Sequence, residues 1–150
     1  MRLEYGALAG EISAALEGAR AMTLATCEGG RVTARSMATV NDGLTILFQT
    51  SGNSLKMRQI AANASVAFAY GNLQAEATAR ITRDAVEVAA FVERFKVKFP
   101  EYYATYSGMA GEVTVVCEPV RFALYRFVDG KPCSDVLDAV KREAYREALA

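Results

Sequence analysis

Short apolar segments separated by tight-turn signals constrain the fold of this chain more than any other feature. Turn-forming residues gather at Glu28-Gly29-Gly30-Arg31, Asn41-Asp42-Gly43 and Gly71-Asn72, and Asn, Asp and Gly tolerate the positive φ that hairpin turns require. The strands expected around these turns are Ala21–Thr26, Val32–Val40, Leu44–Thr50, Val66–Tyr70 and Gln74–Ile81, followed by Glu112–Cys117 and Arg121–Phe127 on either side of Glu118-Pro119. No regular alternation of strand and helix runs through the chain, so an antiparallel α+β barrel is favoured over a doubly wound sheet.

Apolar residues at helical spacing predict helices beside this barrel. Leu8, Ile12 and Leu16 form one apolar stripe, and Gly18 ends that helix. The other expected helices are Leu55–Ala62, capped by Ser54 and ended by Asn63; one opened by Asp84 and bounded by Pro100; a turn carrying Tyr102, Tyr103 and Tyr106; and Asp135–Leu149. We expect residues 1–150 to form a single domain.

The charge balance excludes several classes of partner. Lys and Arg together number 17, as do Asp and Glu, so the formal net charge is zero. Proteins that bind nucleic acid usually carry a basic surplus, and anionic membranes attract basic segments, so we expect neither partner. No apolar run approaches the roughly 18 residues that span a bilayer, and Glu4 and Glu11 interrupt any signal-peptide pattern. The expected compartment is the cytoplasm.

The residues that usually carry catalysis are scarce. The chain contains no histidine, which excludes Ser-His-Asp and Cys-His hydrolytic chemistry within it and removes the commonest ligand of zinc and of haem. Cys27, Cys117 and Cys133 are scattered without a C-x-x-C pair and are interpreted as inert small hydrophobic residues. We therefore expect no metal site, and any redox chemistry would belong to a bound cofactor.

One constellation in the central strands points to phosphate binding. Ser54-Leu55-Lys56 begins a helix, whose first N–H groups and partial positive charge attract anions. Thr50 adds a hydroxyl, and Lys56 and Arg35 add the two positive charges that a phosphate monoester requires. Gln74 offers both a donor and an acceptor, which fits the imide edge of a flavin ring. From the residues alone, ordinary surface roles for these side chains stay open.

The order of these segments adds a family resemblance. The relevant stretches lie between residues 20 and 82 and are Leu24-Ala25-Thr26, Gly30–Met37, Leu47–Thr50, Ser54–Lys56, Ile60–Ala67 and Leu73-Gln74. Together they resemble the pyridoxamine 5′-phosphate oxidase-like family of FMN-binding split barrels. The resemblance implies an antiparallel split β-barrel of about six to seven strands with flanking helices. It also implies a homodimer with two FMN sites at the subunit interface.

The resemblance also assigns roles to individual residues. Arg35, Ser54 and Lys56 would hold the FMN phosphate, with Leu55 between them and Thr50 adding a hydroxyl or backbone contact. Ser36, Met37 and Ala38 would line the isoalloxazine ring, and Gln74 would bond the ring edge from the partner subunit or across the barrel. Phe91, Phe95 and Phe99 are expected in the core or in dimer packing, and the three tyrosines that follow are expected to pack beside the barrel.

Two departures from the family pattern limit the functional assignment. Ala64 stands where the family has proline, and the chain has no histidine for the Arg-x-His-x-Arg substrate motif of the true pyridoxamine phosphate oxidases. The resulting hypothesis is an FMN-dependent oxidoreductase related to pyridoxamine 5′-phosphate oxidase, with its substrate unassigned. The alternatives are a non-catalytic flavin-binding stress or sensor protein, the same fold binding a deazaflavin or, less readily, a haem, and a structural or interaction domain without cofactor.

Overall fold

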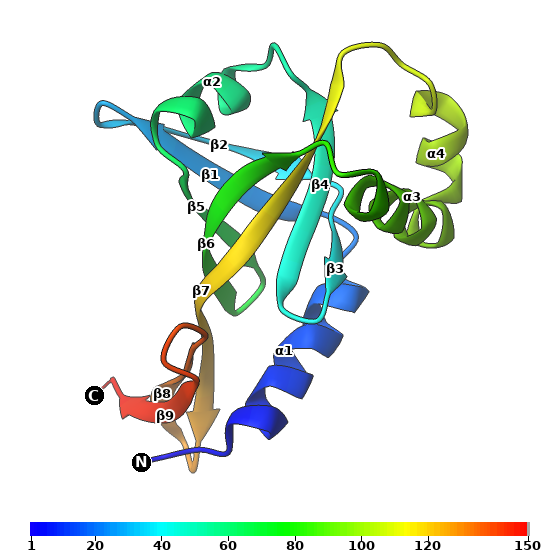
Figure 1. Ribbon diagram of the computed structural model, residues 1–150. Helices are drawn as coiled ribbons and strands as arrows, with labels where there is room; N and C mark the ends of the chain where they lie inside the picture. The colour runs from blue at the N-terminus through cyan, green and yellow to red at the C-terminus, as the bar shows by residue number, and fades with distance from the viewer. Residues whose placement is uncertain (150) are drawn as a thin grey trace.

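A computed structural model describes residues 1–149 of the chain, which form four helices and nine strands (Figure 1). In chain order these are α1 (Tyr5–Gly18), β1 (Met22–Glu28), β2 (Arg31–Met37), β3 (Val40–Asp42), β4 (Thr45–Ser51), α2 (Leu55–Ala62), β5 (Ser65–Tyr70), β6 (Leu73–Thr82), α3 (Ala85–Lys98), α4 (Pro100–Tyr106), β7 (Glu112–Val128), β8 (Lys131–Asp138) and β9 (Glu143–Ala148).

All strand pairs are antiparallel, and their order is β2-β1-β5-β6-β7-β4-β3. The path is open, because β2 and β3 end it without pairing to each other. The expected α+β split barrel is therefore confirmed. Two further strands lie outside this path, since β8 pairs with the distal half of β7 and β9 pairs with β8. Figure 1 shows this hairpin projecting from the barrel beside α1.

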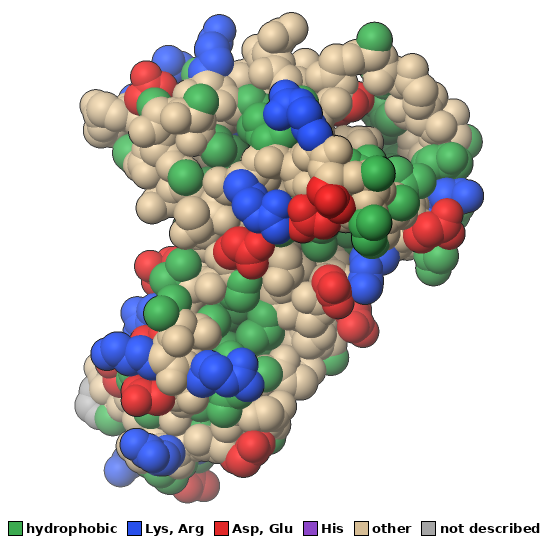
Figure 2. All heavy atoms as spheres, in the orientation of Figure 1, with side chains coloured by type: hydrophobic (Ala, Val, Ile, Leu, Met, Phe, Trp, Pro, Cys, Tyr) green, Lys and Arg blue, Asp and Glu red, His purple; other side chains and the backbone are tan. Residues whose placement is uncertain are grey.

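Charged side chains of both signs are interspersed on the face of the molecule drawn in Figure 2. This distribution accords with the zero formal net charge of the chain. Among residues 1–149, no helix combines the length and apolar character that a bilayer crossing requires.

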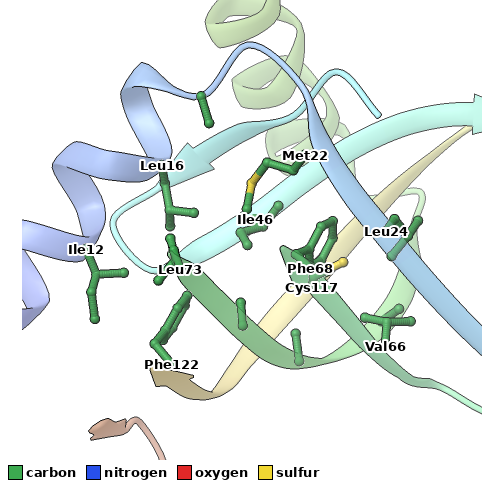
Figure 3. Packing of buried hydrophobic residues seen from close by; sticks show 14 of the residues in the cluster. Ile12, Leu16, Met22, Leu24, Ile46, Val66, Phe68, Leu73, Cys117 and Phe122 are labelled. Atoms are coloured by element: carbon green, nitrogen blue, oxygen red, sulfur yellow. The ribbon is translucent and has the colours of Figure 1, made fainter. Parts of the chain in front are cut away.

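The main core lies between α1 and the inward faces of the strands (Figure 3). Leu8, Ile12 and Leu16 are buried as the helical spacing predicts, and they pack with large side chains such as Phe68 and Phe122. Each such side chain contributes about 1.5–3 kcal/mol when it leaves water. Burial also raises the pKa of the Cys117 thiol to about 12, so this cysteine is a neutral core residue, as expected.

The expected C-terminal helix over Asp135–Leu149 is wrong. The segment forms the β8–β9 hairpin, in which Asp135 lies directly opposite Arg146. The Arg146 guanidinium donates to both Asp135 carboxylate oxygens, at 2.6 and 2.8 Å. Val140, one of the residues that suggested helical spacing, is exposed in the connecting turn. Pairing with β7 and this ion pair therefore override the local helical pattern.

Two strand boundaries also differ from expectation. Glu112–Cys117 and Arg121–Phe127 are parts of the single strand β7, because Pro119 is accommodated where the β6–β7 register shifts next to Ala77. The expected strand Val32–Val40 is instead divided between β2 and β3, which lie at opposite ends of the sheet path. The following hairpin is confirmed, although Asp42 pairs with Thr45 and only Gly43 takes a positive φ, of 59°.

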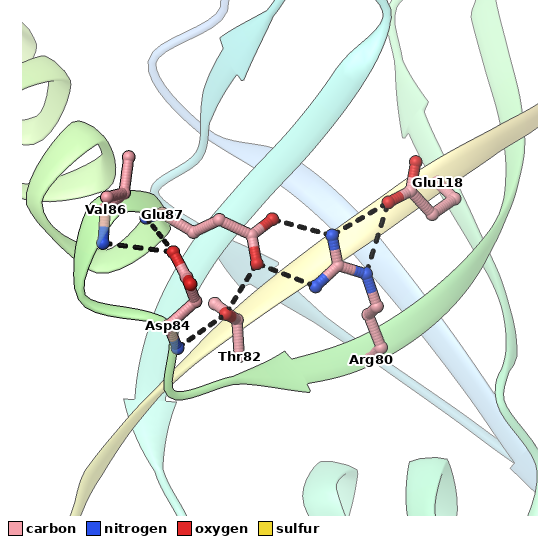
Figure 4. Close-up of polar contacts among 6 residues, drawn as sticks. All are labelled: Arg80, Thr82, Asp84, Val86, Glu87 and Glu118. Atoms are coloured by element: carbon pink, nitrogen blue, oxygen red, sulfur yellow. Dashed lines mark hydrogen bonds and ion pairs between the residues drawn. The ribbon is translucent and has the colours of Figure 1, made fainter.

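A charged network fixes the start of α3 on the sheet (Figure 4). Arg80 on β6 donates to Glu87 on α3 at 2.7 and 3.1 Å and to Glu118 on β7 at 3.0 and 3.2 Å. Asp84 caps α3 as expected, accepting from the Val86 and Glu87 N–H groups at 3.0 Å. These contacts attach the start of α3 to β6 and β7, and the helix also packs against β3 and α4.

Candidate functional site

Two cationic side chains converge where α2 begins. Lys56 Nζ donates to the Thr50 hydroxyl at 3.0 Å, and the Arg35 guanidinium lies close enough to lower the pKa of Lys56. Arg35 itself donates to the Leu24 carbonyl at 3.2 Å and to the Thr26 hydroxyl at 2.8 Å. Neither cation is within ion-pair distance of a carboxylate in the described part of the chain. The structure thus brings Arg35, Thr50 and Lys56 together.

The pKa of Lys56 reports how this arrangement affects its charge. Burial lowers that pKa most, the Arg35 charge lowers it further, and Glu112 acts in the opposite direction. Burial also lowers the pKa of Arg35. The protein therefore holds two like charges together at some cost, and an anion placed between them would relieve this repulsion.

Ser54 occupies the N-cap position of α2, yet its hydroxyl makes no capping hydrogen bond. This corrects the expectation that the side chain caps the helix. The Oγ atom is buried and has no hydrogen-bond partner among the described residues. A buried polar group left unsatisfied costs about 1–3 kcal/mol. The Ser54 hydroxyl is therefore available to a ligand at the start of α2, where Leu55 is the first helical residue.

A buried polar network behind Arg35 was not foreseen from the sequence. The Gln59 carbonyl oxygen accepts from Thr26 and Thr33 at 2.5 Å each, and its amide nitrogen donates to the Arg31 carbonyl at 3.2 Å. Thr33 also accepts from Arg35. Gln59 is 1% exposed and lies three residues after Lys56, so the two share one side of α2. That spacing was the available signal.

The three residues assigned to the flavin ring line a cavity of about 370 Å³ next to the cation pair. Ser36, Met37 and Ala38 form one side, at the end of β2. The remaining lining residues come from β4, the α3–α4 segment and the start of β7, and they are Gln49, Thr50, Ser51, Phe95, Tyr102, Tyr106 and Glu112. Thr50 therefore belongs both to the cavity and to the Lys56 contact.

Aromatic residues from α3 and α4 form the opposite wall of this cavity. Phe91, Phe95, Phe99 and Tyr102 follow one another with ring centroids 5.4, 5.3 and 5.5 Å apart. Phe91 and Phe99 are buried in a second, smaller core, as expected. Tyr102 is 42% exposed and stacks on Phe99 at an interplanar angle of 16°. The structure thus places Tyr102 and Tyr106 on a cavity wall.

Gln74 lies apart from Arg35, Thr50 and Lys56. It is exposed on the outward face of β6 and lines a separate hollow with Thr23, Ala69 and Ala123. Strand register places Ser36, Thr23, Ala69 and Gln74 in one row across β2, β1, β5 and β6. Three strand spacings separate the ends of this row by about 14 Å. Gln74 therefore shares a sheet face with Ser36 without joining Arg35 and Lys56.

No group of His, Cys, Asp and Glu side chains that could hold a metal ion occurs among residues 1–149. The donors that converge here are instead cations and hydroxyls, which suit an anion.

Known proteins share features of this sequence and of this fold. A sequence model for pyridoxamine 5′-phosphate oxidase matches residues 8–125. No curated protein gives a match to the chain. Among solved structures, a Listeria innocua protein assigned to pyridoxamine 5′-phosphate oxidase has a TM-score of 0.64 and 19% identity, covering 78% of this chain and 97% of its own.

Other structural neighbours carry different ligands in their names. The haem storage protein HutZ from Vibrio cholerae has a TM-score of 0.62 and 19% identity, covering 79% of this chain and 91% of its own. An F420 reductase has a TM-score of 0.56 and 23% identity, and the match covers 73% of this chain and 94% of the reductase. At these identities the likeness establishes the fold alone.

Proposed function

Because the chain belongs to the pyridoxamine 5′-phosphate oxidase family, we propose that it is an FMN-binding flavoprotein whose cofactor phosphate lies among Arg35, Ser54 and Lys56. Residues 1–150 would form one FMN-binding domain. The observation that carries this proposal is the buried Ser54 hydroxyl, which has no hydrogen-bond partner among residues 1–149, beside two cations that contact hydroxyl and carbonyl oxygens there but pair with no carboxylate. A phosphate monoester at neutral pH carries close to two negative charges and several acceptor oxygens. It would neutralise Arg35 and Lys56 and accept from Ser54, while Thr50 orients the Lys56 ammonium.

The charge of the cluster favours FMN over the other ligands considered. A deazaflavin of the F420 type carries a phosphodiester, which supplies a single negative charge to two cations. Haem needs an axial ligand, and this chain has no histidine to provide the usual one. A monoester matches the pair of cations most closely.

The isoalloxazine ring would extend from the phosphate into the cavity lined by Ser36, Met37 and Ala38. When bound, FMN supplies hydride and single-electron chemistry, and the protein binds and orients it. Arg35 would be held in place for the phosphate by Thr26, Thr33 and, through them, the buried Gln59. We propose an FMN-dependent oxidoreductase, with a flavin-binding sensor protein as the alternative.

A homodimer would explain the position of Gln74. Around Gln74 the outward sheet face carries the small side chains of Ala25, Ala67 and Ala123, with the charged pair Glu76 and Arg121 beside them. Val32 on the same face is 66% exposed. If this face packs on a second copy, Gln74 can approach the ring held by the partner. The free thiols of Cys27, Cys117 and Cys133 fit a reducing compartment such as the cytoplasm.

The test is the absorption spectrum of the purified protein, followed by titration of flavin-free protein with FMN and identification of the released flavin. We expect a yellow protein that releases FMN and rebinds one FMN per chain. Protein that stays colourless in excess FMN would overturn the assignment. Steady-state turnover with NAD(P)H and candidate acceptors then separates an oxidoreductase, which turns over, from a sensor, which does not.

A further inference from the structure

A second hollow, of about 360 Å³, adjoins the cavity that the flavin ring would occupy. It lies between α3, α4 and the segment that leads into β7. The two hollows share Gln49, Phe95, Tyr106 and Glu112 as lining residues. A volume of this size suits a small organic ligand. A compound bound there would contact the same side chains as the flavin ring from the other side.

The walls of the second hollow are suited to a planar molecule. Phe95 is half-buried and stacks on the buried Phe91, with ring centroids 5.4 Å apart and planes inclined by 23°, so a buried ring supports it from behind. The rings of Tyr106 and Tyr102 lie edge to face with centroids 6.4 Å apart. Tyr106 lines both hollows and is 51% exposed. Exposed aromatic faces on a fixed scaffold stack well with flat rings.

Glu112 sets the charge preference. Among the described residues it is the one charged side chain on the lining of either hollow, and neither lining includes a Lys or Arg. Within residues 1–149 it forms no ion pair, although it raises the pKa of Lys56 and so lies within its electrostatic reach. If a cofactor phosphate neutralises Lys56, the Glu112 carboxylate is left uncompensated beside the second hollow.

We propose that the second hollow is the substrate site, and that it takes planar aromatic compounds that are uncharged or cationic and rejects anionic ones. This inference rests on the proposed function in calling the ligand a substrate of the flavin and in having the cofactor phosphate neutralise Lys56. The aromatic walls provide the affinity and Glu112 provides the selectivity. Phosphorylated or carboxylated substrates would place a negative charge next to a carboxylate, without a cation to offset it.

Calorimetric titration with three matched bicyclic probes tests the proposal, using the protein with and without saturating FMN. The probes are quinoline, the N-methylquinolinium cation and quinoline-6-carboxylate. We expect the cation to bind the FMN-loaded protein at least about tenfold more tightly than the anion, the scale of one nearby charge in a partly exposed site. Glu112→Gln should reduce that ratio to about threefold or less.

Tyr106 variants check the aromatic wall. Tyr106→Leu should weaken all three probes by about three- to tenfold, the scale of a lost aromatic pair, whereas Tyr106→Phe should preserve binding. Tyr125→Leu, which removes an exposed aromatic ring outside both linings, is the matched control. Far-UV circular dichroism of each variant verifies that the fold is retained.

The outcomes separate this inference from the proposed function. If FMN does not bind but the probes bind and Tyr106→Leu weakens them, the second site stands and the flavoprotein assignment fails. If FMN binds and the cation gains no preference over the anion, the inference is overturned. Displacement of N-methylquinolinium by FMN would also overturn it, because the hollow would then be part of the cofactor's own site.

Discussion

Lys56 in the first turn of α2 donates a hydrogen bond to Thr50 near the end of β4, across 3.0 Å. This contact spans the loop that contains Ser54, whose buried hydroxyl has no partner among the described residues. A simple connection between β4 and α2 does not explain why a partly buried ammonium lies next to Arg35. The arrangement instead fits a preformed anion site.

Removing either cation should weaken FMN binding. We expect Lys56→Ala and Arg35→Ala each to cost about 1–3 kcal/mol, the range of a charge-assisted hydrogen bond, or about five- to 150-fold in Kd. Arg58→Ala is the matched control, because Arg58 lies on the same helix with its side chain exposed. The measurement is quenching of FMN fluorescence on titration. Equal affinities for all four proteins would remove both cations from the site.

Ser54→Ala should separate ligand binding from stability. Since the hydroxyl does not cap α2, the substitution should leave the free energy of unfolding of the FMN-free protein unchanged or slightly higher, while FMN affinity falls by about 1 kcal/mol. Asp84→Ala provides the contrast, because Asp84 does cap its helix and should lose about 1 kcal/mol of stability. Urea unfolding of both variants gives the comparison. A loss for Ser54→Ala similar to that for Asp84→Ala would show that the hydroxyl serves the helix.

The affinity for FMN should depend on pH in a defined direction. The phosphate approaches its full charge as pH rises above about 6, so affinity should rise there. Because the pKa of Lys56 is lowered from 10.5, its charge, and with it the affinity, is lost at a lower pH than for an ordinary lysine. Lys56→Arg should retain affinity into that alkaline range, since guanidinium stays protonated. Coincident pH profiles for the two proteins would contradict this role.

The lowered pKa of Lys56 has the opposite effect on the stability of the FMN-free protein, which should rise with pH. A lysine pKa lowered by folding means that the unfolded chain binds more protons, so stability rises with pH towards 10.5. Bound phosphate, which favours the charged form of Lys56, should reverse this dependence of stability on pH.

The part of the fold that could be predicted is the part governed by local signals. Hairpin turns such as that at Gly43, and the apolar stripe of Leu8, Ile12 and Leu16, depend on neighbouring residues, and the structure confirms both. The β8–β9 hairpin was missed because the contact of buried Asp135 with Arg146 joins residues eleven positions apart. A charged residue in a core cannot be distinguished from a surface charge before the partner strand is known.

The residues of the candidate site likewise divide into those that a local pattern reveals and those that depend on distant contacts. Arg35, Ser54 and Lys56 were found through a short spaced pattern, and Ser36, Met37 and Ala38 through their order along one strand. The aromatic wall that includes Tyr106 was assigned to packing, since nothing local reveals that α4 folds back over β4. Gln59 was missed because its spacing from Lys56 indicates a shared side of the helix, whereas its burial depends on the threonines that lie opposite it in the fold.

The network at the start of α3 should govern stability in acid. Arg80 and Thr82 lower the pKa of Glu87 to about 2 by hydrogen bonding. A carboxyl whose pKa is lower in the folded state stabilises the protein above its unfolded value, here 4.5, and loses that contribution as pH falls towards 2. Glu87→Gln should therefore flatten the decline of Tm between these pH values. Glu93→Gln, on the same helix with a single exposed contact to Lys96, should leave the decline in place.

The β8–β9 hairpin should depend on one buried carboxylate. Asp135 is 2% exposed and contacts Arg146 in two places and Arg126 at 3.2 Å. Asp135→Asn would leave two guanidinium groups without their shared anion, and breaking a buried pair on one side costs about 3–5 kcal/mol. We expect the lower end of that range, because both arginines are partly exposed and can regain water. Chemical unfolding measures the loss.

A second variant distinguishes the ion pair from side-chain volume. Asp135→Leu with Arg146→Leu replaces the pair by apolar groups on facing strands and should recover most of the loss, since such replacements are often neutral. Because the hairpin lies outside the path β2 to β3, neither variant should change FMN affinity in protein that remains folded. A coupled loss of FMN binding would show that the hairpin supports the barrel more directly than its position in the sheet indicates.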